Sequence, residues 1–287
     1  TMAGFALAAF GFGLVVAMLL PGLGLGDDFV STRATYYGSP DCLGTPTGAC
    51  GYGEFGRNVN DANVAGVSRL WKNGTGCGGC YQVRCKAPNV CSDDGVNIVV
   101  TDYGEGDHTD FILSPRAYGR MARPNCAPEL YKYGVVEVEY KRIPCRYAGY
   151  NIVFKVKEHS KYPDYLAVVL LYQAGQYDVT AVDIWQEDCK QWRGTRRAYG
   201  AVFDVVTPPK GQLRVRFQLV SSVETTWVES KTAIPGEWKA GATYPNITIR
   251  RFSLHAYSNS LFLASAQFTE GQYGLSLNMR RNYELDL

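Results

Sequence analysis

Hydrophobic and polar residues alternate along most of the chain after residue 80. A period of two is typical of half-buried β-strands, because successive side chains of a strand point to opposite faces of the sheet. In the first half of the chain this pattern predicts strands over Cys80–Cys85, Val96–Tyr103 and Val135–Tyr140. In the second half it predicts strands over Ile152–Val156, Leu166–Tyr172, Asp178–Ile184, Val202–Val206 and Leu213–Val220. The sequence therefore predicts an all-β protein.

Helical periodicity is scarce, and one segment shows it clearly. Ser114 is a residue type that caps helix N-termini, and Pro115 suits the first helical position. The apolar residues that follow recur at helical spacing. We therefore expect a short helix over Ser114–Ala122.

A long uncharged run from Phe5 to Leu20 precedes the first charged residue, Asp27. Such a run, followed by Pro21 and small residues, is typical of a secretory signal peptide, with cleavage expected after Gly26. The alternative is an uncleaved membrane anchor, since about 20 apolar residues can span a bilayer. We expect a signal peptide over residues 1–26, secretion, and no membrane contact after cleavage.

Composition narrows the class of protein further. The chain has 46% hydrophobic and 20% charged residues, which excludes a wholly disordered protein. Its 29 basic and 27 acidic residues leave a net charge of +2, too small to favour the phosphate backbone of nucleic acid. Only three histidines are available as nitrogen ligands, so we expect neither a metal nor a cofactor. We expect a monomer with no nucleic-acid partner.

Eight of the nine cysteines lie between Cys42 and Cys145, and Cys189 follows alone. In a secreted protein an even cluster predicts four disulfides, although eight cysteines allow 105 pairings. A redox pair or a zinc site at Cys77 and Cys80 is the alternative. We expect Cys189 to be a small buried hydrophobic residue, or else an intermolecular link.

The cysteine cluster also indicates where one domain ends. Because it stops at Cys145, we expect a disulfide-rich domain over residues 27–143 and a linker over 144–146. A second domain of the size of a β-sandwich would then occupy residues 147–245. Residues 246–287 carry no pattern that we can assign.

Four blocks of residues resemble, in order and spacing, the successive blocks of a plant expansin. They are residues 34–38 (Ala-Thr-Tyr-Tyr-Gly), 48–53 (Gly-Ala-Cys-Gly-Tyr-Gly), 76–85 (Gly-Cys-Gly-Gly-Cys-Tyr-Gln-Val-Arg-Cys) and 100–103 (Val-Thr-Asp-Tyr). Residues 151–156, 211–217 and 233–238 continue the resemblance, which spans residues 34–245. It is closest to the expansin-like B branch.

The resemblance implies a fold and a disulfide pairing. The fold is a six-stranded double-psi β-barrel, similar to family-45 endoglucanases, followed by an immunoglobulin-like β-sandwich that binds polysaccharide. The implied bridges are Cys50–Cys77, Cys80–Cys145 and Cys85–Cys91, which leaves Cys42 and Cys126 as a fourth pair.

Asp102 is the first candidate for chemistry in the barrel. Glycoside hydrolysis uses two carboxylates, one as acid and one as base or nucleophile. Asp102 follows the apolar run Val96–Val100, where burial would favour the protonated acid, and Thr35 and Tyr103 could hydrogen-bond to it. The alternative is a turn carboxylate that caps Gly104.

The second carboxylate is missing at the position that the resemblance implies. Expansins carry a His-Phe-Asp there, and the alignment places Ile112 on the Asp. Asp110 lies two residues away on the same strand face, displaced by roughly 7 Å, and could substitute. The simpler interpretation places Asp107, His108 and Asp110 in a solvated loop.

Aromatic residues of the second half are candidates for sugar stacking, because the C–H groups of sugars pack on aromatic rings. Matching the family's binding face selects Tyr165, Trp192 and Tyr199, with Leu166 standing where an aromatic is common and Tyr162 as a supplement. We expect Trp185 and Phe203 to belong to the core. The alternative is that the three selected rings are ordinary half-buried strand residues.

These observations predict a secreted plant cell-wall protein that binds cellulose, xyloglucan or related glucans and loosens their contacts without hydrolysis. The first alternative is a weak endoglucanase or transglycosylase that uses Asp102 and Asp110. It would require a carboxylate of Asp110, Glu54 or Asp41 about 6.5–9.5 Å from Asp102. The second alternative is a secreted defence lectin. Asn73 and Asn246 lie in glycosylation sequons.

Overall fold

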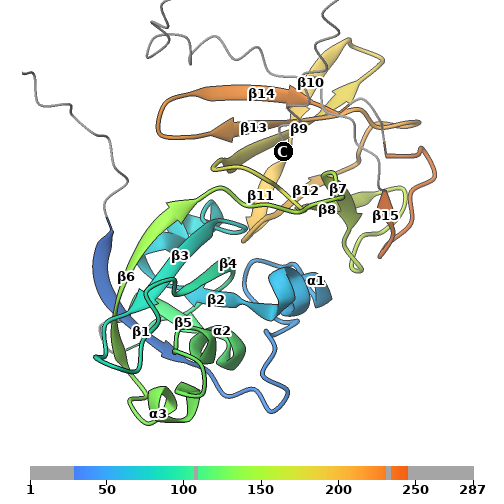
Figure 1. Cartoon of the computed structure of the whole chain (residues 1–287). Helices are drawn as coiled ribbons and strands as arrows, with labels where there is room; N and C mark the ends of the chain where they lie inside the picture. The colour runs from blue at the N-terminus through green and yellow to red at the C-terminus, as the bar shows by residue number, and fades with distance from the viewer. Residues whose placement is uncertain (1–28, 107–108, 231–233, 245–287) are drawn as a thin grey trace, which may run out of the picture.

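A computed structural model of the chain describes residues 29–106, 109–230 and 234–244 (Figure 1). Within them the strands form a closed barrel and two further sheets, and the helices are short, so the all-β prediction is confirmed. The predicted signal peptide, Asn246, the C-terminal tail, Asp107 and His108 lie outside the described residues. No helix in the described part combines the length and apolar character needed to cross a bilayer.

Six strands close into a barrel in the spatial order β1-β5-β2-β4-β3-β6 (lower left in Figure 1). They are β1 (Val30–Tyr36), β2 (Val64–Val67), β3 (Cys80–Cys85), β4 (Val96–Tyr103), β5 (Phe111–Leu113) and β6 (Val136–Ile143). The pairs β1–β5 and β2–β4 are parallel, and the other neighbours are antiparallel. Closure pairs every strand on both sides, so the barrel exposes no free sheet edge.

The alternating pattern predicted β3 and β4 with their observed bounds. It did not predict β2, because all four residues of this strand are buried and their sequence does not alternate. The three residues of β5 are too few to show a period. Pairing with neighbouring strands, rather than a local sequence pattern, therefore defines the short strands β2 and β5.

The helices cap the barrel. They are α1 (Glu54–Asn58), α2 (Pro115–Arg120) and α3 (Ala127–Tyr131), with 3₁₀ helices η1 (Val59–Ala62) and η2 (Arg69–Gly74). The predicted helix is α2, and Ser114 caps it by accepting a hydrogen bond from the Ala117 N–H. The hydroxyl of Ser114 also donates to the Ala62 carbonyl at 2.7 Å, which fixes the helix to the end of η1.

Three disulfides join the barrel's loops and strands, with the pairing that the resemblance implies: Cys50–Cys77, Cys80–Cys145 and Cys85–Cys91. The redox and zinc alternatives for Cys77 and Cys80 are thereby excluded in this structure. The fourth bridge is wrong, because Cys42 and Cys126 are both free. Cys126 stands at the N-cap of α3 with its thiol directed to the Asn89 carbonyl, whereas the Cys42 carbonyl accepts a hydrogen bond from the Arg116 N–H of α2 at 3.3 Å.

The expectation that Cys189 is buried is also wrong. Cys189 is exposed and free, in the turn that connects β9 to β10. Residues 187–190, which form this short turn, are all exposed in the described part of the chain.

The second half of the chain forms two sheets around one core (upper right in Figure 1). The five-stranded sheet contains, in spatial order, β11 (Arg196–Tyr199), β12 (Val202–Val206), β8 (Tyr165–Leu171), β7 (Val153–Val156) and β15 (Thr243–Tyr244). The four-stranded sheet contains β10 (Gln191–Gly194), β9 (Asp178–Gln186), β13 (Val215–Val220) and β14 (Thr225–Glu229). Phe203 lies in the core between them, as predicted.

Strand β8 is buried on both faces because it separates two cores. Leu166, Val168 and Leu170 point into the core between the sheets. Ala167, Val169 and Leu171 point the other way and join the hydrophobic core of the barrel. The barrel therefore packs on the outer face of the five-stranded sheet.

Candidate functional site

A row of four residues crosses the barrel wall from β1 to β4. Strand pairing places Thr35 beside Ile112, Ile112 opposite Gly66, and Gly66 beside Asp102. Paired residues project from the same face of a sheet, so the side chains of Thr35, Ile112 and Asp102 share one face. Gly66 has no side chain and leaves a gap between Ile112 and Asp102. We call these four residues the groove row.

Asp102 is held by backbone amides. Its Oδ1 accepts hydrogen bonds from the N–H groups of Ala49 at 2.6 Å and Tyr103 at 2.8 Å. Gly48 lies against the carboxylate, since a Cβ at this position would stand 3.4 Å from Cγ of Asp102. The loop over residues 48–49 therefore fixes the orientation of Asp102 while the Oδ2 atom has no hydrogen-bond partner among the described residues.

The side-chain partners expected for Asp102 are different in the structure. The Thr35 hydroxyl donates to the Gly134 carbonyl at 2.9 Å, and the Tyr103 hydroxyl donates to Glu105. Thr35 belongs to the groove row and Tyr103 follows Asp102 at its end, but neither hydroxyl bonds to Asp102. The bond to Glu105 raises the pKa of Tyr103.

Tyr37 and Trp71 are groove residues that the sequence did not single out. Burial raises the pKa of Tyr37, and the negative charges of Asp102 and Asp41 raise it further. The Trp71 ring packs on Tyr103 with a centroid distance of 5.4 Å. Tyr37 belongs to the first expansin-like block, which is the signal that could have identified it.

Position 112 faces Asp102 across Gly66. Adjacent strands lie about 4.8 Å apart, so the two spacings from β5 through β2 to β4 separate the backbones of Ile112 and Asp102 by roughly 10 Å. This span is comparable to the carboxylate separation of an inverting glycosidase, about 6.5–9.5 Å. Ile112 instead places its Cδ1 against Gly104, where a Cβ would stand only 2.7 Å away. An aliphatic group occupies the place from which a second carboxylate could act.

Asp110 does not lie in a solvated loop, as the simpler interpretation expected, because only 4% of it is exposed. Its carboxylate accepts from the Thr32 hydroxyl at 2.6 Å, the Ser68 hydroxyl at 3.2 Å and two nitrogens of Arg69. Hydrogen bonds from Arg69 lower the pKa of Asp110 despite its burial. Four donors fill the acceptor positions of one carboxylate, so Asp110 has none left for a water nucleophile.

The other candidate carboxylates are also engaged. Asp41 accepts from the Leu43 N–H at 3.0 Å and the Ser39 hydroxyl at 2.7 Å, and pairs with Arg57. These contacts lower the pKa of Asp41 to about 2, which makes it a weak base. Glu54 is exposed on α1 and lies 3.5 Å from Arg57.

Three rings form a second row on the outer face of the five-stranded sheet. The His159 ring lies between those of Tyr165 and Tyr199, with centroid distances of 6.0 and 6.4 Å and interplanar angles of 36° and 35°. Tyr199 is 43% exposed, and His159 is exposed in the turn after β7. The Tyr165 hydroxyl donates to Asp204 at 2.9 Å, which holds this ring in place. We call these residues the tyrosine–histidine row.

Trp192 does not belong to this row, contrary to the prediction. It lies on β10 opposite Trp185 of β9, on the outer face of the four-stranded sheet. The chain passes between the sheets at Gly194 and Thr195, so Trp192 and Tyr199 end on opposite sides of the sandwich. Trp185 is not a core residue either, since it is partly exposed beside Trp192.

The two tryptophans belong to a row in which indole rings and guanidinium groups alternate. We call it the tryptophan–arginine ladder. Arg214 lies over both Trp185 and Trp192, and Arg216 lies over both Trp192 and Trp227, at 4.4–5.7 Å from the ring centroids. The guanidinium groups cover faces that a sugar would need. This ladder therefore links the strands of the four-stranded sheet, and Trp227 is its most exposed ring, at 40%.

One loop connects the groove row to the tyrosine–histidine row. Ala49 donates to Asp102, and two residues later Gly51 approaches Tyr199 so closely that a Cβ there would stand 2.7 Å from Cε2 of the ring. The buried Lys157 donates from Nζ to the Gly51 carbonyl at 2.8 Å. The loop over residues 48–51 thus joins the two rows through direct contacts.

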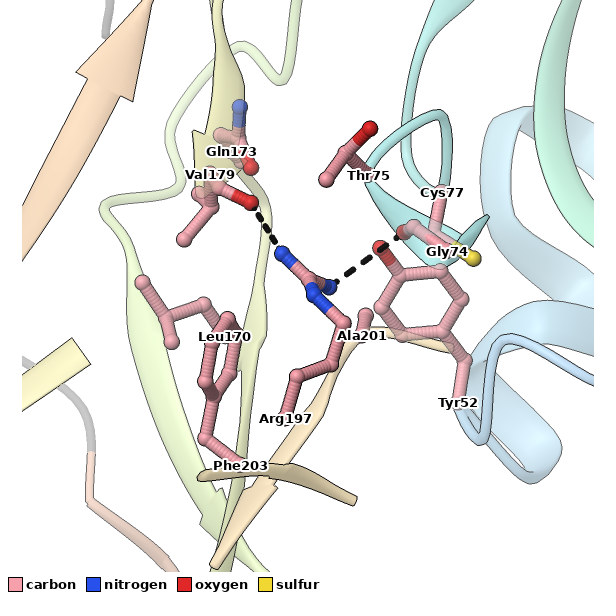
Figure 2. Close-up of a pocket in the computed structure, with 10 residues that line it drawn as sticks. All are labelled: Tyr52, Gly74, Thr75, Cys77, Leu170, Gln173, Val179, Arg197, Ala201 and Phe203. Carbon is pink, nitrogen blue, oxygen red and sulfur yellow. Dashed lines mark hydrogen bonds between the residues drawn. The ribbon is translucent and has the colours of Figure 1, made fainter. Parts of the chain in front are cut away.

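Arg197 fixes the barrel against the sandwich. Figure 2 shows its guanidinium between the Val179 carbonyl of the sandwich and the Gly74 carbonyl of the barrel. It also lies over the Phe203 ring, 4.4 Å from the centroid. Arg142 and Lys72 of the barrel add ion pairs to Asp178 at 2.9 and 3.3 Å. These contacts therefore fix the relative position of the two rows.

Asn73, the sequon residue that the structure describes, is exposed on η2. An attached glycan would be accessible there, and its occupancy stays a prediction.

Two family models match the chain. The Expansin C-terminal domain matches residues 152–235, and the Lytic transglycolase model matches residues 63–140. Expansin-like B1 of Arabidopsis thaliana is 62% identical over 230 residues, which is 80% of this chain and 92% of that protein. Expansin-like B1 of rice, Oryza sativa subsp. japonica, is 43% identical over 221 residues, covering 76% of this chain and 86% of the relative.

Two solved structures share the fold. The crystal structure of apo Clavibacter michiganensis expansin has a TM-score of 0.55 at 19% identity, covering 76% of this chain and 96% of the other. A variant of that expansin in complex with cellohexaose has a TM-score of 0.56 at 19% identity, with coverages of 76% and 97%.

Proposed function

Because this chain belongs to the expansin family, we propose that it is a secreted cell-wall protein that binds glucan chains along the groove row and Tyr199 and Tyr165. We propose further that it loosens contacts between chains without cleaving them. Cellulose and xyloglucan are the expected ligands. A family member of the same fold was crystallised with cellohexaose, which supports a glucan as ligand.

The direct linkage of the groove row to the tyrosine–histidine row is the observation that carries this proposal. Asp102, the 48–51 loop and Tyr199 follow one another through direct contacts. A glucan presents C–H faces that pack on aromatic rings and hydroxyl groups that hydrogen-bond to carboxylates. Rings on the sandwich and a carboxylate in the groove therefore offer complementary contacts to one extended chain.

The absence of hydrolysis follows from the groove chemistry. A general acid or base each contributes roughly 10²–10⁴-fold to the rate, so a site with one free carboxylate should turn over at most in traces. Among the described residues Asp102 has an open oxygen, whereas Asp110 accepts from four donors and Asp41 is paired with Arg57. Ile112 cannot exchange a proton. The endoglucanase alternative with Asp110 as base is therefore disfavoured.

The test measures the extension of heat-inactivated cell-wall strips under load, beside a reducing-sugar assay on cellulose and xyloglucan. We expect extension without release of reducing ends. Asp102→Asn and Tyr199→Ala should each reduce extension. Trp227→Ala is the matched control, because Trp227 is 40% exposed on the opposite sheet and stacks only in the tryptophan–arginine ladder.

Two outcomes would contradict the proposal. Release of reducing ends that Asp102→Asn abolishes would identify a hydrolase. Binding to glucans without any extension of the wall would instead favour the lectin alternative.

A further inference from the structure

Lys157 is a buried lysine at the boundary between the sandwich and the barrel. It follows β7 directly, and only 6% of it is exposed. Its backbone is fixed, because its N–H donates to the Ala167 carbonyl at 2.8 Å and its carbonyl accepts from the Ser160 N–H at 3.0 Å. Burial of an ammonium group is costly unless hydrogen bonds or ion pairs compensate it. The contacts of the ammonium group therefore indicate what Lys157 does.

The Nζ atom of Lys157 reaches from the sandwich to a carbonyl of the barrel. It donates to the Gly51 carbonyl at 2.8 Å and lies 3.4 Å from the Glu158 carboxylate. Gly51 is buried, and its carbonyl has no other hydrogen bond in the described part of the chain. A buried carbonyl requires a partner. Lys157 supplies this partner across the domain boundary.

The conformation of Gly51 makes this partner important. Its φ is +78°, which glycine adopts easily but which no side chain holds in place. A Cβ at position 51 would stand 2.6 Å from Val202 and 2.7 Å from Tyr199, so a side chain here would clash with both. The ammonium group of Lys157 therefore selects one orientation of a peptide that packing alone leaves free to rotate.

Gly51 is the last residue of a turn that contacts the groove row. Its N–H donates to the Gly48 carbonyl at 2.9 Å, and between these two residues Ala49 donates to Asp102 at 2.6 Å. Gly48 lies against the same carboxylate. The hydrogen bond from Lys157 thus holds the end of the turn whose middle orients Asp102.

We propose that Lys157 is a positioning residue that keeps Asp102 and Tyr199 in register for one glucan chain. This inference rests on the proposed function, because it assumes that a single chain contacts both rows. A short oligosaccharide can occupy one row alone, so its affinity should not depend on the register. A longer chain gains the second set of contacts when both rows are already in place, as two linked binding sites act together. Lys157 therefore sets the advantage of long chains over short ones.

The test compares Lys157→Met with the matched control Lys155→Met. Lys155 lies two residues earlier and pairs with the same Glu158 at 2.7 Å, but among the described residues it makes no hydrogen bond to the 48–51 turn. Glu158 is exposed and keeps one lysine in either variant, so neither substitution leaves a buried charge unpaired. Both variants should therefore melt within a few degrees of the natural protein.

Titration of the full-length protein with cellotriose and cellohexaose gives the ratio of the two affinities. Lys157→Met should lower the advantage of cellohexaose by about 2- to 10-fold, the range that one hydrogen bond is worth. It should leave the affinity for cellotriose unchanged. Lys155→Met should keep both affinities. Equal weakening of both oligosaccharides in Lys157→Met would show a general effect on folding and would overturn the inference.

NMR of the protein without ligand separates this inference from the proposed function. The amide resonance of Ala49 reports its hydrogen bond to Asp102, so it should shift in Lys157→Met and stay in place in Lys155→Met. An unchanged Ala49 resonance or an unchanged affinity ratio in Lys157→Met would overturn the role of Lys157 alone. Absence of binding by the natural protein to either oligosaccharide would overturn the proposed function, and the role of Lys157 in binding with it.

Discussion

Two aspartates of the barrel have opposite environments, and this difference assigns their roles. Asp102 is held through one oxygen by backbone amides and presents the other to the groove. Asp110 is buried and surrounded by Arg69, Thr32 and Ser68. A carboxylate with a free oxygen can meet a ligand, whereas one that is fully bonded stabilises the fold. Asp102 therefore belongs to the binding surface and Asp110 to the structure.

Asp110→Asn should lower the free energy of unfolding by about 2 kcal/mol at pH 7, because it removes charge-assisted hydrogen bonds. The folded protein lowers the pKa of Asp110, so its stabilising effect is present above the unfolded pKa of about 3.9 and is lost as pH falls through the lower folded value. The difference between variant and natural protein should shrink in acid. Urea unfolding at pH 7 and pH 3 measures it, and Asp93→Asn, an exposed aspartate, is the control.

Ile112→Asp should place a carboxylate opposite Asp102 across Gly66. If wall loosening depends on a pair of carboxylates, wall extension should rise above that of the natural protein. Ile112→Asn is the matched control, because it has the same shape and no charge. Equal extension by the Asp and Asn variants would show that a second carboxylate has no part in the activity.

At the scale of elements, the two outer faces of the sandwich have different tasks. The outer face of the five-stranded sheet is covered by the barrel and ends in the tyrosine–histidine row. The outer face of the four-stranded sheet carries the tryptophan–arginine ladder. Arg216 in this ladder donates two hydrogen bonds to Asp183, which is only 8% exposed. The ladder links β9, β10, β13 and β14 through side chains as well as backbone.

Arg216→Leu should destabilise the four-stranded sheet by about 2 kcal/mol, because it leaves the buried Asp183 carboxylate without its partner. Arg214→Leu should cost less than about 1 kcal/mol, since Arg214 pairs with the more exposed Glu229. Chemical unfolding followed by tryptophan fluorescence compares the two. Neither variant should lose cellulose binding. A loss of binding would indicate that the ligand binds to this face of the sandwich. Equal destabilisation would refute the ranking.

At the scale of the whole molecule, a glycine at the interface lets the backbones of the barrel and the sandwich approach each other closely. Gly200 has a φ of +46°, and a Cβ there would stand 2.2 Å from the Ala49 carbonyl. The neighbouring Ala201 N–H donates to the Cys50 carbonyl at 3.0 Å. Ala49 also holds Asp102, so the same loop couples the domain interface to the groove. A rigid interface is what allows one extended chain to contact both rows at once.

Gly200→Ala should separate the two domains and therefore weaken cellohexaose binding and split the thermal unfolding transition in two. Gly211→Ala is the matched control. Gly211 has a similarly left-handed φ of +80°, and nothing lies within 4 Å of the place of its Cβ. Calorimetry should show one transition for Gly211→Ala. Identical behaviour of the two variants would mean that backbone strain, and not the interface, accounts for the change.

The sequence by itself determined the all-β class, the strands with a clear period of two, the cap of α2 and, through the resemblance, the barrel and three disulfides. These features depend on local pattern or on blocks of residues that stay together along the chain. Strands β3, β4 and β12 have the bounds that alternation predicts, because each is flanked by residues that break the period.

Only the tertiary structure decided the features that depend on contacts between distant segments. Asp110 became a buried ion-pair partner because Arg69 lies beside it in space. Cys42 and Cys126 remained unpaired, with Cys126 at the N-cap of α3 and its thiol directed to Asn89. Trp192 and Tyr199, close in sequence, lie on opposite faces because the chain changes sheet between them. His159 joined two tyrosines because a turn and two strands meet there, and no local pattern contains that encounter.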